Sequence, residues 1–147
     1  MAQRHAGDAV GVDEALNLPR VVAGVGFRRN ASAEAIDALI RRALAAAHIA
    51  PARVGTIATA LDRAADASIR AAAARFGLVP LGLAPDALRA VDAYVPTRSA
   101  RIERTRGVGS LAEAAALAGA GVGATLVAPR IDDGAVTCAL ALVAQTP

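Results

Sequence analysis

From position 21 the chain reads Val21-Val22-Ala23-Gly24-Val25-Gly26-Phe27-Arg28-Arg29-Asn30-Ala31-Ser32. An apolar run breaks at two glycines, passes two arginines and reaches a serine that can begin a helix. This order predicts a buried strand, a tight turn and a helix N-terminus, with guanidinium groups at the turn. Because free backbone N–H groups and the helix dipole both favour negative charge at such a position, the corner is predicted to bind an anion.

Strand and helix patterns alternate beyond this corner. The first predicted helix buries a stripe that includes Ile36, Leu39 and Ile40, and it stops before Pro51. The patterns that follow predict a strand over 54–59, a helix over 66–76 closed by Gly77, an edge strand over 78–82, a short helix over 85–91, an alanine-rich helix from Ser110, and strands over 124–128 and 135–143. Asp133-Gly134 between the last two strands predicts an antiparallel hairpin.

The segment 92–106 is polar and carries four arginines, at positions 98, 101, 104 and 106. We expect an irregular connection here, and a connection this long within one domain is usually functional or disordered. Gly107-Val108-Gly109 follows, and Ser110 with Glu113 forms the pattern of a capping box.

These elements predict an α/β fold, a single three-layer α/β/α domain with a mixed sheet that ends in an antiparallel hairpin. The length of 147 residues is enough for one self-sufficient core. We expect a flexible N-terminal arm over residues 1–19 and the domain over 20–147.

Composition narrows the classes of function. All sixteen basic residues are arginine, the net charge is +3, and aromatic residues make up 2% of the chain. Because the arginines are scattered and few rings are available to stack on bases, nucleic-acid binding is not expected. No apolar run is long enough to span a bilayer, and the single Cys138 excludes an internal disulfide. We therefore expect a cytoplasmic protein that does not contact membranes.

Several candidate residues admit both a structural and a chemical interpretation. Gly24 and Gly26 do not complete a dinucleotide-binding fingerprint, because Arg29 occupies the third glycine position. Glu113 could be a general acid or base, or only the partner of Ser110 in the capping box. Asp62-Arg63 could contact a ligand or form a surface pair. His5 and His48 have no partners at metal-ligand spacing, so no metal and no cofactor are expected.

Four blocks of the chain resemble one family, that of the small cobalamin-biosynthesis protein CobE and of the C-terminal domain of CbiG, the cobalt-precorrin-5A hydrolase. The resemblance covers roughly residues 20–143. The blocks lie at 24–32, 57–63, 107–117 and 126–130 with 137–139, and the third is the most specific. Arg63 and Arg130 stand where lysine is common in the family. The region that is associated with lactone opening in CbiG has no counterpart in this sequence.

The resemblance implies a role in assembling the corrin ring, whose intermediates are polycarboxylated tetrapyrroles. It predicts a ligand site formed by Gly24, Gly26, Phe27, Arg28, Arg29, Asn30, Asp62, Arg63, Arg104, Arg106, Gly107, Gly109 and Ser110. In it the arginines would clamp carboxylates, and the glycines would let the backbone approach. Two alternatives stay open: an enzyme of the pathway with Asp62 or Glu113 as proton carrier, and a non-catalytic partner of other cobalamin-pathway proteins.

Overall fold

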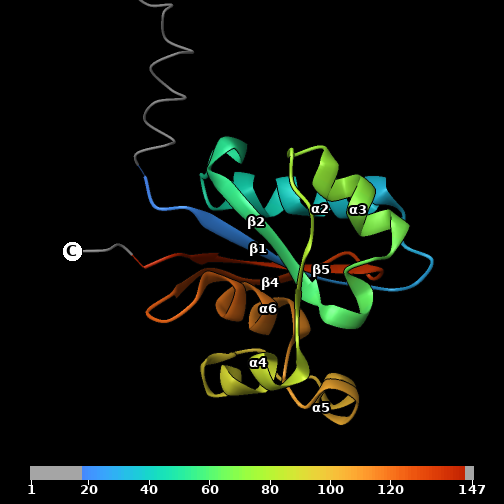
Figure 1. Cartoon of the computed structure of the whole chain (residues 1–147), viewed down its shortest axis with the longest axis vertical. Helices are drawn as coiled ribbons and strands as arrows, with labels where there is room; N and C mark the ends of the chain where they lie inside the picture. Colours follow the sequence, from blue (N-terminus) through green and yellow to red (C-terminus); the bar gives the residue numbers. More distant parts are fainter. Residues whose placement is uncertain (1–17, 145–147) are drawn as a thin grey trace, which may run out of the picture.

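The computed structural model describes residues 18–144 and contains one five-stranded mixed sheet (Figure 1). The strands are β1 (Val21–Phe27), β2 (Val54–Ala60), β3 (Leu81–Leu83), β4 (Thr125–Asp132) and β5 (Val136–Leu142). They lie in the order β3-β2-β1-β5-β4. β1, β2 and β3 are parallel, whereas β5 runs antiparallel to both β1 and β4. The predicted α/β fold, with its closing hairpin, is confirmed.

Helices cover both faces of the sheet, so the three layers are also confirmed (Figure 1). α2 (Ala33–Ala46) and α3 (Ala67–Ala74) pack on one face, where Ile36, Ile40 and Ile69 enter the first core cluster. α6 (Leu111–Ala120) packs on the other face. α4 (Pro85–Ala90) and α5 (Ala100–Arg106) lie beyond α6, and three short 3₁₀ turns, η1 (Pro51–Arg53), η2 (Leu61–Arg63) and η3 (Asp92–Tyr94), complete the described chain.

The alanine content is explained by the packing of α6 on β1. A Cβ atom at Gly24 would lie 2.0 Å from the carbonyl oxygen of Ala112 and 2.4 Å from the amide nitrogen of Ala116. Helix and strand therefore approach more closely here than any side chain on the strand would permit. The helix faces this contact with small residues, and all of positions 111–117 are buried. Much of the block at 107–117, which carries the resemblance to the family, therefore serves the close packing of α6 on β1.

The structure corrects the prediction for residues 92–106, which are not irregular. They contain η3 and the seven-residue helix α5. Ser99 caps α5 by accepting a hydrogen bond from the Ile102 N–H, and Gly107 ends it with a φ of 75°. Both signals are visible in the sequence, but the helix is short and buries no residue, so it has no apolar stripe to mark it.

Other differences concern element ends. The third strand is confirmed at a sheet edge, but it begins at Leu81, after Pro80, rather than at residue 78. β4 extends to Asp132 through Pro129, which an edge strand tolerates. The predicted arm over 1–19 lies almost wholly outside the described residues. Within residues 18–144, no helix has the length and apolar content needed to cross a bilayer.

Candidate functional site

The corner after β1 forms as the sequence predicts. The Ser32 hydroxyl accepts a hydrogen bond from the Ala35 N–H at 3.0 Å and so caps α2. Between strand and cap, the Arg28 N–H donates to the Ala135 carbonyl at 2.8 Å, which ties the corner to the turn between β4 and β5. The side chains of Arg28 and Arg29 extend from this anchored backbone and are exposed.

Arg63 joins the corner to the end of β2. It lies in η2 and is 9% exposed, and its guanidinium stacks on the Phe27 ring with 4.1 Å to the centroid. Nη1 donates to the Phe27 carbonyl and Nε donates to Asp66, both at 2.8 Å. The third nitrogen, Nη2, is buried and has no hydrogen-bond partner within residues 18–144. Arg63 therefore links the end of β1 to the end of β2.

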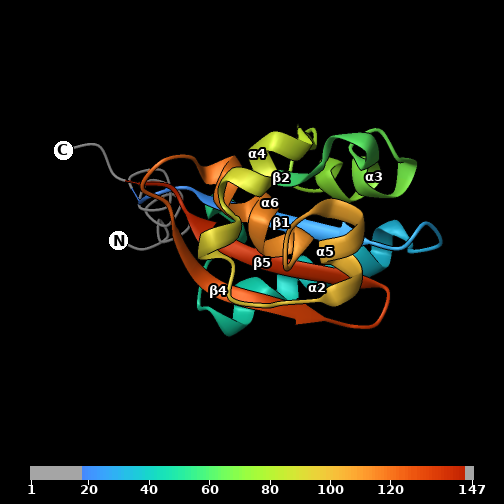
Figure 2. The ribbon, with the colours of Figure 1, turned by 90° about the horizontal axis from the view of Figure 1, so that it is seen from below.

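A cleft of about 700 Å³ opens at this end of the sheet. Figure 2 shows α5 in front of the region where β1 leaves the sheet and β4 turns into β5. The cleft is bounded by β1 and its corner, η2, α5, the start of α6 and the β4–β5 hairpin. Its lining residues are Gly26, Phe27, Arg28, Arg29, Asp62, Arg63, Ser99, Arg101, Ile102, Thr105, Arg106, Leu111, Arg130, Asp132, Gly134, Ala135, Val136 and Thr137.

The cleft brings together part of the predicted site. Gly26, Phe27, Arg28, Arg29, Asp62, Arg63 and Arg106 line it. The first corner and the end of α5 therefore share one cavity, although they are far apart in the sequence.

The other predicted residues lie elsewhere. Gly24 is packed under α6 and Asn30 is exposed beyond the lining. Arg104 and Gly107 line a second, smaller cavity of about 410 Å³, bounded by α4 and α5. Gly109 is buried beneath Arg98 and Thr97, and Ser110 caps α6. These glycines and Ser110 have packing or capping roles that account for them.

Sequence reasoning missed Arg101 and Arg130 as members of the cleft. Proximity to Gly107 and Gly109 favours Arg104 and Arg106 over Arg101, and a segment predicted to be irregular does not indicate which of its arginines share a face. A helix beginning at Ser99 places Arg101, Thr105 and Arg106 on the cleft and Arg104 away from it. Arg130 could have been found from its position just before the hairpin, because β4 neighbours β5 and β5 neighbours β1.

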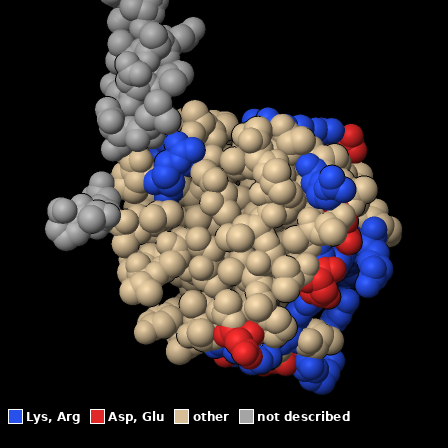
Figure 3. Space-filling view, in the orientation of Figure 1, with Lys and Arg blue, Asp and Glu red and all other residues tan. Residues whose placement is uncertain are grey.

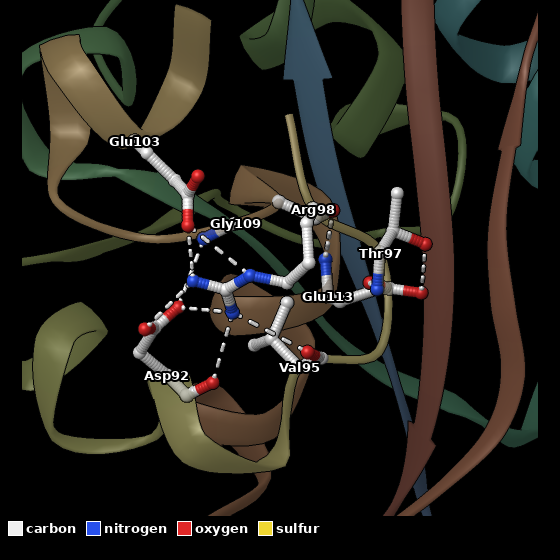
Figure 4. Close-up of polar contacts among 8 residues, drawn as sticks. Asp92, Val95, Thr97, Arg98, Glu103, Gly109 and Glu113 are labelled. Atoms are coloured by element: carbon white, nitrogen blue, oxygen red, sulfur yellow. Dashed lines mark hydrogen bonds and ion pairs between the residues drawn. The ribbon is translucent and has the colours of Figure 1, made fainter. Parts of the chain in front are cut away.

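Glu113 is fully buried at the base of α6 and does not line the cleft. The Ser110 hydroxyl accepts from the Glu113 N–H at 3.3 Å, as a capping box requires. The carboxylate, however, does not return to Ser110. It accepts from the Thr97 N–H at 2.9 Å, the Thr97 hydroxyl at 3.0 Å and the Arg130 N–H at 2.9 Å. Glu113 thus joins the segment before α5, through Thr97, to β4, through Arg130, and Figure 4 shows the contact with Thr97.

A second polar node, centred on Arg98, holds the base of α5 (Figure 4). The guanidinium donates to both carboxylate oxygens of Asp92, at 2.9 and 3.0 Å, and to Glu103 of α5. Asp92 also accepts from the Gly109 N–H at 2.8 Å. The Arg98 guanidinium and this N–H hold the pKa of Asp92 below its usual range. Both nodes act on the N-terminal side of α5, through Thr97 and Arg98 before the helix and Glu103 within it, whereas the helix itself buries no residue.

The charge of the cleft is strongly positive, with six arginines against two aspartates. Asp62 pairs with Arg106 at 2.5 Å across the cleft, and the hydrogen bond from Arg106 lowers the pKa of Asp62. Asp132 pairs with Arg130 at 3.3 Å. Arg28, Arg29 and Arg101 form no ion pair within the described residues. In Figure 3 charged side chains gather along the margin of the molecule, and the centre of that face is uncharged.

Two further groups bear on the chemistry of the protein. Cys138 is a buried free thiol whose pKa is raised to about 12 by burial, so it is not a nucleophile. Among residues 18–144, no three His, Cys, Asp or Glu side chains are placed to hold a metal ion. The chemistry of the cleft is that of guanidinium groups beside a small apolar floor of Phe27, Leu111 and Val136.

Comparisons with known proteins agree with this architecture. Residues 21–141 match the family described as Cobalamin synthesis G C-terminus. The chain is 35% identical over 121 residues to Protein CobE from Sinorhizobium sp, a match that covers 82% of this chain and 79% of that protein.

Solved structures give the same result. The crystal structure of CobE, a protein from the cobalamin biosynthetic pathway, superposes with a TM-score of 0.81 at 31% identity, covering 88% of this chain and 94% of that one. The cobalamin biosynthesis protein chiG from Agrobacterium tumefaciens str. C58 gives a TM-score of 0.67 at 36% identity, covering 85% and 99%. A cobalamin biosynthesis protein G homologue from Sulfolobus solfataricus shares the fold at 20% identity, over 86% of this chain and 37% of that one, with a TM-score of 0.67.

Proposed function

The chain belongs to the family of CobE and of the CbiG C-terminal domain, and we propose that it binds a polycarboxylated tetrapyrrole intermediate in its arginine-lined cleft. Its relatives are cobalamin-biosynthesis proteins, and this chain is a protein of the same pathway. The proposed role is to hold or pass on an intermediate of the corrin ring.

The excess of arginine in the cleft is the observation that carries this proposal. Arg28 and Arg29 line one side of the cleft and Arg101 lines the other, and none of the three has an ion-pair partner within residues 18–144. Each guanidinium can form paired, charge-assisted hydrogen bonds with a carboxylate. A ligand with carboxylates spread around a rigid, partly apolar ring matches that distribution, because its ring can rest on the apolar floor. The volume of about 700 Å³ falls in the range of small-molecule sites.

The alternative of an enzyme with a carboxylate proton carrier has less support. Glu113 is fully buried, satisfied by three hydrogen bonds, and absent from the cleft lining. Asp62 does line the cleft, but its ion pair with Arg106 lowers its pKa and keeps it ionised. A group held in this way is a poor proton donor near neutral pH. We therefore favour binding over acid–base chemistry.

The alternative of a partner module is motivated by the fold itself. The same fold makes up 37% of a longer chain in the Sulfolobus solfataricus homologue, where it is joined to further sequence. A stand-alone domain of this kind could dock on other cobalamin-pathway proteins. Co-purification of the tagged protein with a pathway enzyme from a producing cell would support docking, and a protein that stays monomeric and partnerless would count against it.

We propose the cytoplasm as the compartment. A free thiol in the core, at Cys138, is compatible with reducing conditions. Separate assay of cytoplasmic and membrane fractions for the protein would test this assignment.

The binding proposal is tested by calorimetric titration with hydrogenobyrinic acid, a metal-free corrin polycarboxylate. We expect Arg28→Ala and Arg29→Ala each to weaken binding by about tenfold or more, because charge-assisted hydrogen bonds contribute roughly 1.5–3 kcal/mol. Arg70→Ala is the matched control, because Arg70 is exposed on α3 and does not line the cleft. Absence of binding by the unmodified protein, or equal affinity in all three variants, would overturn the proposal.

A further inference from the structure

The ion pair between Asp62 and Arg106 connects the two sides of the cleft. Asp62 lies in η2 at the end of β2, and Arg106 is the last residue of α5, 44 positions along the chain. Their closest atoms, Oδ1 and Nη1, are 2.5 Å apart. Both residues line the cleft, and the Asp62 side chain is 65% exposed. An exposed carboxylate is therefore held inside an arginine-rich cavity by an arginine from the opposite wall.

The other carboxylates near the cleft arginines are arranged differently. Asp66 pairs with the buried Arg63 and does not line the cleft. Asp132 lies on the same strand as its partner Arg130, and their closest atoms are 3.3 Å apart. Only the pair of Asp62 with Arg106, among those in the described chain, spans the cavity that the ligand would enter. It is also exposed to solvent, so exchange of its carboxylate for another is sterically open.

We propose that Asp62 is a specificity-determining residue that stands in for a carboxylate of the ligand and competes with it for Arg106. This inference rests on the proposed function, because it concerns the same cleft and the same class of ligand. When the ligand enters, one of its carboxylates takes the place of Asp62 on Nη1 of Arg106. A ligand that presents an amide or a methyl group at that position leaves the internal pair intact and forgoes the contact. Asp62 therefore selects for ligands that carry a negatively charged group at the position that meets Arg106.

The contacts of α5 explain why the competition is local. The Arg98 and Glu113 nodes fix the N-terminal side of α5, and neither node includes Arg106 or Asp62. Loss of the Asp62 contact therefore leaves the base of α5 in place and frees the Arg106 guanidinium at its end. The free guanidinium then joins Arg28, Arg29 and Arg101 as a site for an external anion.

A double-mutant cycle with hydrogenobyrinic acid as the calorimetric probe tests the exchange. Asp62→Asn keeps the size of the side chain and removes its charge, and we expect binding to tighten by about twofold to fivefold, the range that an exposed ion pair accounts for. Arg106→Gln alone should weaken binding by about tenfold. In the Arg106→Gln background, Asp62→Asn should give no further gain, because the contested partner is gone. Asp86→Asn, on α4 and outside the cleft, is the control for a change in net charge.

The outcomes separate this inference from the function it rests on. If the unmodified protein binds and Asp62→Asn binds equally or more weakly, the inference is wrong and the binding function stands. If Asp62→Asn still tightens binding in the Arg106→Gln background, the inference is also wrong, because the tighter binding would then come from the changed net charge of the cleft. If neither the unmodified protein nor any variant binds the probe, the proposed function fails and the inference fails with it.

Discussion

The two walls of the cleft are built by different means. The wall at the ends of β1 and β2 rests on the sheet ladder, the packing of α6 under Gly24, and the hydrogen bond from Arg63 to the Phe27 carbonyl. The opposite wall, α5, buries no residue and is held at its base by polar contacts of Glu113, Arg98 and Asp92. One wall is thus fixed by backbone pairing and apolar packing, and the other is fixed by side-chain hydrogen bonds.

This difference suits the proposed binding role. Binding costs less free energy where the backbone that carries the contacting side chains is already ordered. Arg28 and Arg29 project from the fixed wall, where the Arg28 N–H is tied to Ala135. Arg101 and Arg106 project from α5, whose only partly buried apolar residue in the second core cluster is Ile102. The following changes test whether the two walls differ in this way.

The largest effect is expected from Gly24→Ala, which attacks the fixed wall. The added Cβ would lie 2.0 Å from the Ala112 carbonyl oxygen, and only a shift of α6 away from β1 can relieve that clash. Because both neighbours are backbone atoms, we expect the free energy of unfolding to fall by about 3 kcal/mol or more. Urea unfolding followed by circular dichroism measures it.

Gly55→Ala is the matched control for this change. Gly55 also lies in a strand, β2, but its added Cβ would meet only the flexible side chain of Arg20. We expect the free energy of unfolding to change by less than about 1 kcal/mol. Equal effects at the two glycines would show that the close approach of α6 does not determine the stability of this wall.

The same contrast explains what the sequence predicts and what it does not. The corner of the fixed wall is encoded locally: the apolar run, Gly26, the two arginines and the Ser32 cap follow one another, and each leaves a recognisable signal. The other strand patterns and the closing hairpin are predicted for the same reason, whereas the order of the strands in the sheet is not. The α5 wall depends on Glu113 reaching Thr97 and Arg130, which are 16 and 17 positions away. Such contacts leave no periodic pattern, so the sequence indicates only a capping or acid–base role for Glu113 and does not indicate that Arg130 reaches the cleft. Arg101 is not indicated either, because α5 has no buried stripe that would show which side of it faces the cleft.

The intermediate effect is expected from Glu113→Ala, which attacks the base of the α5 wall. The change leaves the partly buried N–H groups of Thr97 and Arg130 without their acceptor, and we expect a loss of roughly 2–3 kcal/mol in the free energy of unfolding. Amide hydrogen exchange should accelerate in α5 more than in β1, because the carboxylate contacts the segment before α5 and forms no hydrogen bond with β1.

Ser110→Ala is the companion variant for Glu113→Ala. It removes the cap of α6 but keeps the carboxylate contacts, so we expect a loss of about 1 kcal/mol and no selective loosening of α5. If Glu113→Ala costs no more than Ser110→Ala, or if α5 and β1 exchange to the same extent, the carboxylate does not hold the second wall.

The smallest effect concerns pH and the Arg98 node. Arg98 and the Gly109 N–H hold the pKa of Asp92 below its usual range. A carboxyl whose pKa is lower in the folded protein contributes stability that is complete above the unfolded pKa and is lost as the pH falls through the folded one. Asp92→Asn should therefore reduce stability at pH 7, and its difference from the unmodified protein should shrink as the pH falls below about 4. Urea unfolding at a series of pH values measures it, and high salt should narrow the difference throughout. If the stability difference stays constant or grows on acidification, the charge of Asp92 does not stabilise this node. Glu113 would then be the one residue that supports the contrast between a wall held by polar contacts and a wall held by packing.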